Sequence, residues 1–123
     1  MRRPALFAAA LVVALPGIAF AHPRLITASP AANAIAAKPT RIVLTFSENL
    51  VGPLSGIELT MTGMRGMANH APMPIRGFTA RASGKNLTVN LPRPLPAGTY
   101  ELKWHVVAAD QHRVEGRYNF TAR

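Results

Sequence analysis

Four methionines and one histidine lie close together near the middle of the sequence. The stretch "MTGMRGMANHAPM" covers residues 61–73 and contains every methionine except the initiator. Thioethers and a neutral imidazole are soft donors that suit Cu(I), whereas thioethers alone bind Cu(II), Zn²⁺ or Mg²⁺ poorly. The stretch therefore predicts a Cu(I) site, with the candidate ligands Met61, Met64, Met67, His70 and Met73.

The residues between these methionines argue against a helix whose apolar stripe packs in a core. Gly63, Gly66 and Pro72 disfavour a helix, and no other large apolar side chain lies between Met61 and Ile75. Met61 ends a predicted strand, so it also fits a core position. A methionine-rich surface that binds a protein partner is the second interpretation of this loop.

The first 21 residues predict a secretory signal peptide. Arg2 and Arg3 precede an apolar run at residues 6–14, and the stretch ends in Ala-Phe-Ala, which is a typical cleavage site. A retained membrane anchor is a poorer interpretation because the apolar run is short. We expect export by the Sec route and a mature single domain of residues 22–123.

Cleavage at this position would create a second set of candidate ligands. His22 would become the first residue, so its free amine and its imidazole Nδ1 could chelate one metal ion. Pro23 has no N–H to ionise, so further ligands must come from elsewhere in the fold. Asp110 and His112 are candidates, and we expect them to project from the same side of an extended segment. An amine, two imidazoles and a carboxylate suit tetragonal Cu(II). An accidental N-terminal histidine and a turn-capping Asp-x-His pair are the alternatives.

Composition excludes several other kinds of site. The chain has no cysteine, so it forms no disulfide, no thiolate zinc site and no blue-copper centre. These features fit a bacterial periplasm. Once Arg2 and Arg3 are removed, 12 basic side chains remain against 5 acidic ones. The basic residues are scattered singly, which indicates a solvated surface and no nucleic-acid partner.

Short strands are the elements expected to position these residues. β-Branched and aromatic runs with partial two-residue alternation occur at residues 41–46, 56–61, 86–91, 99–107 and 117–123. In the fourth run, Tyr100, Leu102, Trp104 and Val106 share one face, and we expect that face to cover a core. Turn signals separate the runs, and no helical stripe of comparable length occurs. The pattern predicts an all-β, single-domain Greek-key β-sandwich or small barrel.

The mature chain resembles the bacterial periplasmic copper-resistance protein C family, called CopC. The similarity lies in "HPRL" at its start, "LTFSENLV" (44–51), the methionine loop, "PLPAGTYELKWHVVAADQHRVEG" (94–116) and a terminal "YNF". The resemblance implies a cupredoxin-like (Ig-like) Greek-key β-sandwich. Many members lack the methionine loop and bind only Cu(II), so this chain is similar to the subgroup that has two copper sites.

The resemblance also implies where each copper ion binds. His22, Asp110 and His112 would bind Cu(II), with Glu48 nearby either as a weak or outer carboxylate or as an ordinary charge at a strand end. At the other end of the sandwich, Met64, Met67, Met73 and His70 would bind Cu(I), with Met61 as an alternative thioether. The histidine here falls three residues after the third loop methionine, whereas the best-known family pattern has two. His105 has no partner ligand nearby in the sequence and is expected to be a surface histidine.

These features together predict a soluble periplasmic copper carrier or buffer that serves copper resistance and homeostasis. We do not expect the protein to be an enzyme. Its copper would pass to or from an inner-membrane copper transporter or a periplasmic multicopper oxidase. Two other classes are open. The N-terminal histidine chelate is similar to the copper centre of lytic polysaccharide monooxygenases, and a metal-free β-sandwich could serve as an interaction module.

Overall fold

Nine β-strands and one short 3₁₀ helix form the part of the chain that the structure describes. The structure is a computed structural model, and it describes residues 10, 22–64, 67 and 71–123. The expected signal peptide and His70 therefore lie outside the described residues, except for Ala10. The elements are β1 Leu25–Ser29, β2 Ile35–Ala36, β3 Arg41–Phe46, η1 Gly52–Leu54, β4 Gly56–Gly63, β5 Met73–Ile75, β6 Ala80–Ser83, β7 Asn86–Asn90, β8 Gly98–Val107 and β9 Arg113–Ala122.

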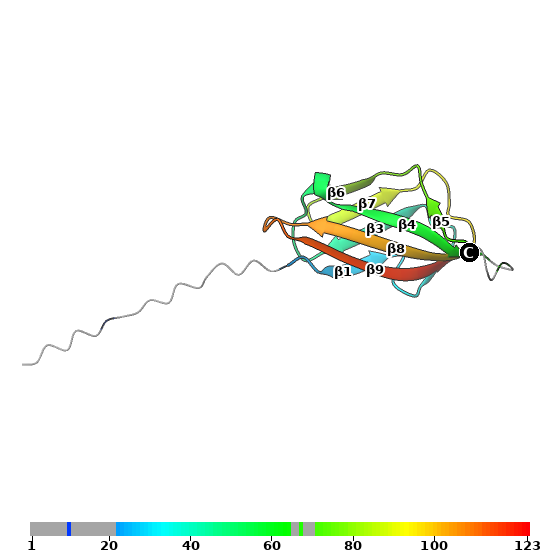
Figure 1. Ribbon diagram of the computed structural model, residues 1–123, viewed down its shortest axis with the longest axis horizontal. Helices are drawn as coiled ribbons and strands as arrows, with labels where there is room; N and C mark the ends of the chain where they lie inside the picture. The colour runs from blue at the N-terminus through cyan, green and yellow to red at the C-terminus, as the bar shows by residue number, and fades with distance from the viewer. Residues whose placement is uncertain (1–9, 11–21, 65–66, 68–70) are drawn as a thin grey trace, which may run out of the picture.

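The strands form two sheets that pack against each other (Figure 1). One sheet has the order β1-β3-β7-β6, and the other has the order β2-β9-β8-β4-β5. The chain crosses between the sheets five times, on entering and leaving β2, from β3 to β4, from β5 to β6 and from β7 to β8, so that strands distant in sequence become neighbours. This is a Greek-key β-sandwich, and the predicted all-β fold is confirmed.

Alternation along the strands builds the core between the sheets. In β8, the side chains of Tyr100, Leu102 and Val106 are fully buried and Trp104 is nearly so, while the intervening residues face outward. This face is the one predicted from the sequence. The core is completed by inward residues of the facing sheet, among them Ile42, Leu44, Phe46, Leu87 and Val89.

Two tyrosines fasten loops to this core through their hydroxyl groups. The Tyr100 O–H donates to the Pro96 carbonyl oxygen at 2.6 Å, and the Tyr118 O–H donates to the Pro30 carbonyl oxygen at 2.8 Å. Burial raises the pKa of each phenol to about 12, because the phenolate would be poorly solvated there. Both groups are therefore neutral donors at physiological pH.

The described residues include no helix long and apolar enough to cross a membrane. The five strands predicted from the sequence all occur, with ends that differ by a few residues; β9, for example, begins at Arg113 and not at Arg117. Four further strands, β1, β2, β5 and β6, were not predicted. All four lie at sheet edges.

Candidate metal centre

The His22 side chain lies at the end of the sandwich where β8 turns into β9. The chain enters the sandwich through Pro23, which is fully buried and directly precedes Arg24 and β1. This burial fixes the start of the domain against the core, while the His22 side chain stays 62% exposed. His22 is therefore presented to solvent from a fixed position.

Asp110 and His112 occupy the β8–β9 loop at the same end. The loop turns at Gln111, which adopts a left-handed backbone conformation with φ of 63°. The Gln111 N–H donates to the Ala108 carbonyl oxygen at 2.9 Å, and the His112 N–H donates to Asp110 Oδ1 at 3.2 Å. The side chains therefore come together through a tight turn, and the expectation of an extended segment here was wrong.

These three side chains form one cluster of possible metal ligands. Asp110 Oδ2 lies 3.3 Å from His22 Nδ1 and 3.3 Å from His112 Nδ1. The two imidazole rings meet edge to face with centroids 5.1 Å apart. One possible ligand atom from each residue lies within 4.8 Å of those of the other two. Among the described residues, this is the group of three side chains that could hold a metal ion. One ion could contact all three donors after small side-chain rotations.

The electrostatics of this cluster favour the ionised form of Asp110. Its carboxylate side chain is only 7% exposed, and the resulting desolvation raises its pKa. The two hydrogen bonds from His112 and the charges of His112 and His22 outweigh desolvation, so the pKa of Asp110 lies below its ordinary value. The cluster therefore offers a carboxylate anion to a cation across the physiological pH range.

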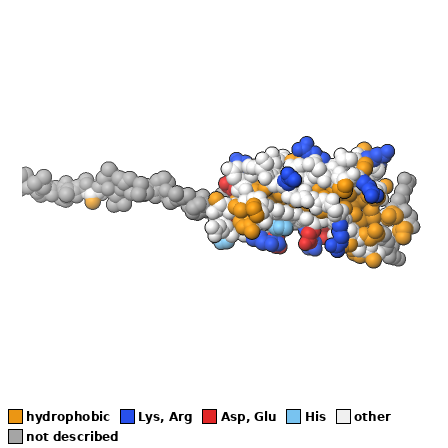
Figure 2. All heavy atoms as spheres, turned by 90° about the horizontal axis from the view of Figure 1, so that it is seen from above, with side chains coloured by type: hydrophobic (Ala, Val, Ile, Leu, Met, Phe, Trp, Pro, Cys, Tyr) orange, Lys and Arg blue, Asp and Glu red, His pale blue; other side chains and the backbone are white. Residues whose placement is uncertain are grey.

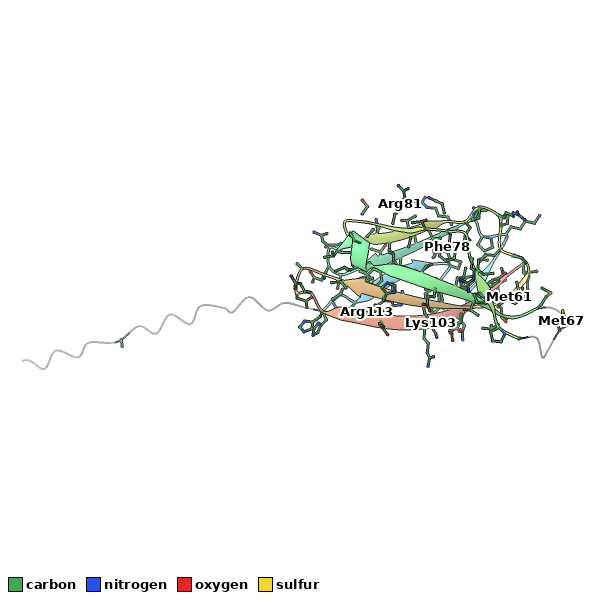
Figure 3. All side chains as sticks on the ribbon, turned by 45° about the horizontal axis from the view of Figure 1, so that its top comes forward. Met61, Met67, Phe78, Arg81, Lys103 and Arg113 are labelled. Carbon is green, nitrogen blue, oxygen red and sulfur yellow. The ribbon has the colours of Figure 1, made fainter. Side chains whose placement is uncertain are left out.

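The methionine stretch lies at the opposite end of the sandwich. In Figure 3, Met67 is at one end, and Arg113, which follows His112 in the chain, is toward the other. Met64 and Met67 form an isolated antiparallel bridge, in which the Met67 N–H donates to the Met64 carbonyl oxygen at 2.9 Å. Met67 and Met73 are 53% and 49% exposed, respectively. Figure 2 shows hydrophobic side chains gathered toward this end.

Met61 differs from the other methionines of this stretch. Its side chain is only 2% exposed and belongs to the core cluster, as its position at a strand end suggested. Its backbone pairs with Met73 on one side and with Tyr100 on the other. Met61 thus packs in the core, while its strand partner Met73 is exposed.

A groove runs along this end of the molecule. It has a volume of about 860 Å³, and its lining includes Met64, Met67, Ala97, the first two residues of β8 and Arg123. Met67 is therefore open to solvent beside this groove, whereas Met64 is partly buried against the core. His70, the imidazole predicted for this site, lies outside the described residues.

Two further residues were singled out from the sequence. Glu48 follows β3 and is half-buried, and it is not a member of the His22, Asp110 and His112 cluster found among the described residues. His105 lies on the outer face of β8, where its ring leans over Gly56 of the neighbouring strand. It too is outside this cluster of the described residues, and it is half-buried.

Comparison with known proteins gives consistent results. The sequence model of the CopC domain family matches residues 25–123 of this chain. Copper resistance protein C of Escherichia coli is 43% identical over 120 residues, which are 97% of this chain and 95% of that protein. Copper resistance protein C of Xanthomonas campestris pv. juglandis is 46% identical over 106 residues, covering 85% and 83%.

A solved structure is similar to this one as well. The crystal structure of PcoC, described as a methionine-rich copper resistance protein from Escherichia coli, superposes with a TM-score of 0.74 at 42% sequence identity. The match covers 84% of this chain and all of the PcoC chain. The similarity therefore extends over both sheets and both ends of the sandwich.

Proposed function

The chain belongs to the CopC family, and on this basis we propose that it is a periplasmic copper carrier or buffer that serves copper resistance and homeostasis. The observation that carries the proposal is the cluster of His22, Asp110 and His112, whose donor atoms lie within 4.8 Å of one another. The names of its relatives, which are copper resistance proteins, support copper as the ion.

Cu(II) is the oxidation state that suits this cluster. Two imidazoles and a carboxylate form a nitrogen and oxygen set, and the free amine of His22 would add a fourth donor after signal-peptide cleavage. Because Pro23 has no N–H, the chelate cannot extend along the backbone. Asp110 then supplies the negative charge that a dication needs, and its lowered pKa keeps that charge available.

Cu(I) suits the opposite end of the molecule. The thioethers of the half-buried Met64 and of the exposed Met67 and Met73 are soft neutral donors, and His70 would supply an imidazole. The similarity of this structure to PcoC, a methionine-rich copper resistance protein, supports a Cu(I) site at this end. Met61, which is buried in the core, is the alternative thioether. Oxidation state would thus decide which site a copper ion occupies.

A carrier fits these sites better than an enzyme. Copper-dependent oxygenases need an open position for oxygen, whereas here the Asp110 carboxylate lies between the two imidazoles. Both donor groups are at the molecular surface, where another protein can reach the ion. An inner-membrane copper transporter and a periplasmic multicopper oxidase are the partners we propose for delivery or removal of copper.

A metal titration of the protein that begins at His22 tests this function. Cu(II) is added in air and Cu(I) is added without oxygen, each against a competing chelator, and the equivalents bound are counted. We expect one equivalent of each. Replacing Met64, Met67 and Met73 together by leucine should abolish only Cu(I) binding, and adding one residue before His22 should weaken only Cu(II) binding. Binding of neither ion would contradict the proposal and would favour a metal-free interaction module.

A further inference from the structure

The residues that lead into β1, His22 to Arg24, form an N-terminal arm, and a clasp of two hydrogen bonds holds this arm to Ser47, the residue after β3. The Arg24 N–H donates to Ser47 Oγ at 2.9 Å, and the Ser47 N–H donates to the Arg24 carbonyl oxygen at 2.9 Å. In a regular antiparallel ladder, the first of these bonds would go to a backbone carbonyl. Here the hydroxyl of Ser47 takes that place, one residue beyond the Leu25 and Phe46 pair where the β1–β3 ladder ends.

This clasp limits how far His22 can move. His22 is two residues from Arg24, and a fully extended chain spans at most ~3.6 Å per residue, so its backbone can range only about 7 Å from the clasp. The fully buried Pro23 lies between them and restricts the movement further. The imidazole is therefore kept near Asp110 before any metal binds.

The segment that contains Ser47 also contacts the other half of the metal site. Leu50 forms an isolated β-bridge with Ala108, and the Val51 N–H donates to the Val107 carbonyl oxygen at 2.7 Å. Ala108 in turn accepts the Gln111 N–H that closes the loop carrying Asp110. Residues 47–51 thus join the arm, which leads into one sheet, to the β8–β9 loop of the other sheet.

From these contacts we infer that Ser47 is a positioning residue for the Cu(II) site. Its hydroxyl holds the Arg24 amide, and through it His22, at a fixed distance from Asp110 and His112. Without the hydroxyl, only one of the two hydrogen bonds to the arm remains, and the arm is less ordered before the metal binds. Binding the ion must then order His22, and this loss of conformational entropy weakens the affinity for Cu(II). This inference rests on the proposed Cu(II) function of the cluster.

The test compares three variants of the protein that begins at His22. Ser47→Ala removes the clasp hydroxyl, and Ser47→Thr restores it. Thr45→Ala is the matched control, because Thr45 lies two residues earlier in β3 and its Oγ1 donates to Asn86 Oδ1 at 2.8 Å, on the side of β3 that faces β7 and not β1. Cu(II) dissociation constants are measured by chelator competition, and thermal unfolding is recorded for each variant.

We expect Ser47→Ala to bind Cu(II) about tenfold more weakly, as is common when a group that orients a metal ligand is lost. Ser47→Thr and Thr45→Ala should stay close to the unaltered protein, and Cu(I) binding should be the same in all. In the metal-free protein, amide exchange at Arg24 should become faster in Ser47→Ala only. This last readout separates arm positioning from a general loss of stability.

Two results would overturn the inference, and only one of them would also overturn the proposed function. If the unaltered protein binds Cu(II) and Ser47→Ala binds it as well as Thr45→Ala does, the role of Ser47 is wrong while the proposed function stands. If the unaltered protein itself binds no Cu(II), the proposed function fails, and the positioning role fails with it.

Discussion

Replacing the methionines one at a time should separate the sulfur that packs in the core from those proposed to bind copper. Met61 is 2% exposed and lies in the core, whereas Met67 and Met73 are about half exposed. Truncating a buried methionine to alanine costs ~2–5 kcal/mol of folding free energy. Truncating an exposed one away from the core usually changes stability by less than ~0.5 kcal/mol.

Replacing a methionine by leucine distinguishes a copper ligand from a core residue, because leucine keeps the volume of methionine and lacks the sulfur. Met61→Leu should cost less than ~1.5 kcal/mol and leave Cu(I) binding unchanged, because Met64, Met67 and Met73 supply the thioethers. Met67→Leu and Met73→Leu should weaken Cu(I) binding with little change in stability. The expected pattern is thus a stability loss at position 61 and a copper loss at the other two.

Both quantities can be measured on the same samples. Urea unfolding is followed by the fluorescence of Trp104, the only tryptophan of the chain, and Cu(I) affinity by chelator competition without oxygen. For a domain of this size, each kcal/mol corresponds to about 4–8 °C in Tm, so Met61→Ala should also stand out in a thermal scan. A Cu(I) loss in Met61→Leu as large as in Met67→Leu would refute the reasoning, because it would make the buried sulfur a ligand.

Three further predictions follow from single contacts. Tyr100→Phe should lower the free energy of unfolding by ~1–2 kcal/mol in urea titrations, because the Pro96 carbonyl oxygen loses its donor. Gly116→Ala should cost ~1–3 kcal/mol and shift the fluorescence of Trp104, since a methyl group there would clash with the indole ring. Asp110→Asn should destabilise the metal-free protein at pH 7, and this deficit should shrink as the pH falls below 3.8, the ordinary pKa of the carboxyl. A lowered folded-state pKa stabilises the fold only while the group is ionised, so unfolding measured from pH 7 to 3 checks the sign.

The strands that could be predicted from the sequence are those with a strong apolar face. β8 alternates large buried residues with polar ones over ten positions, so its periodicity is clear. β6 buries only Ala80 and Ala82 inward, whose small side chains give a weak signal. β5 contains Pro74, which is typical of an edge strand and masks the pattern. Edge strands bury less, so their sequences are less constrained.

The sequence singled out the three residues of the candidate metal cluster but not the geometry that brings them together. The types and spacing of Asp110 and His112 indicated a ligand pair, and the structure brings both to His22. The turn that joins them depends on the left-handed conformation of Gln111, and glutamine is not among the residues that signal such a turn. Ser47 was not singled out, because its contact with Arg24 joins residues that are far apart in the sequence.

The length of β8 governs how the two proposed copper sites can communicate. Its ten residues rise by about 3.3 Å each and so span roughly 30 Å, from the groove beside Met64 and Met67 to the loop that carries Asp110. No side chain can bridge that distance across the rigid core. A copper ion that changes oxidation state in one site therefore cannot shift to the other by a local movement of ligands. On the proposed function, the ion has to leave one site and pass through solvent or another molecule before it reaches the other, as the proposed carrier role requires.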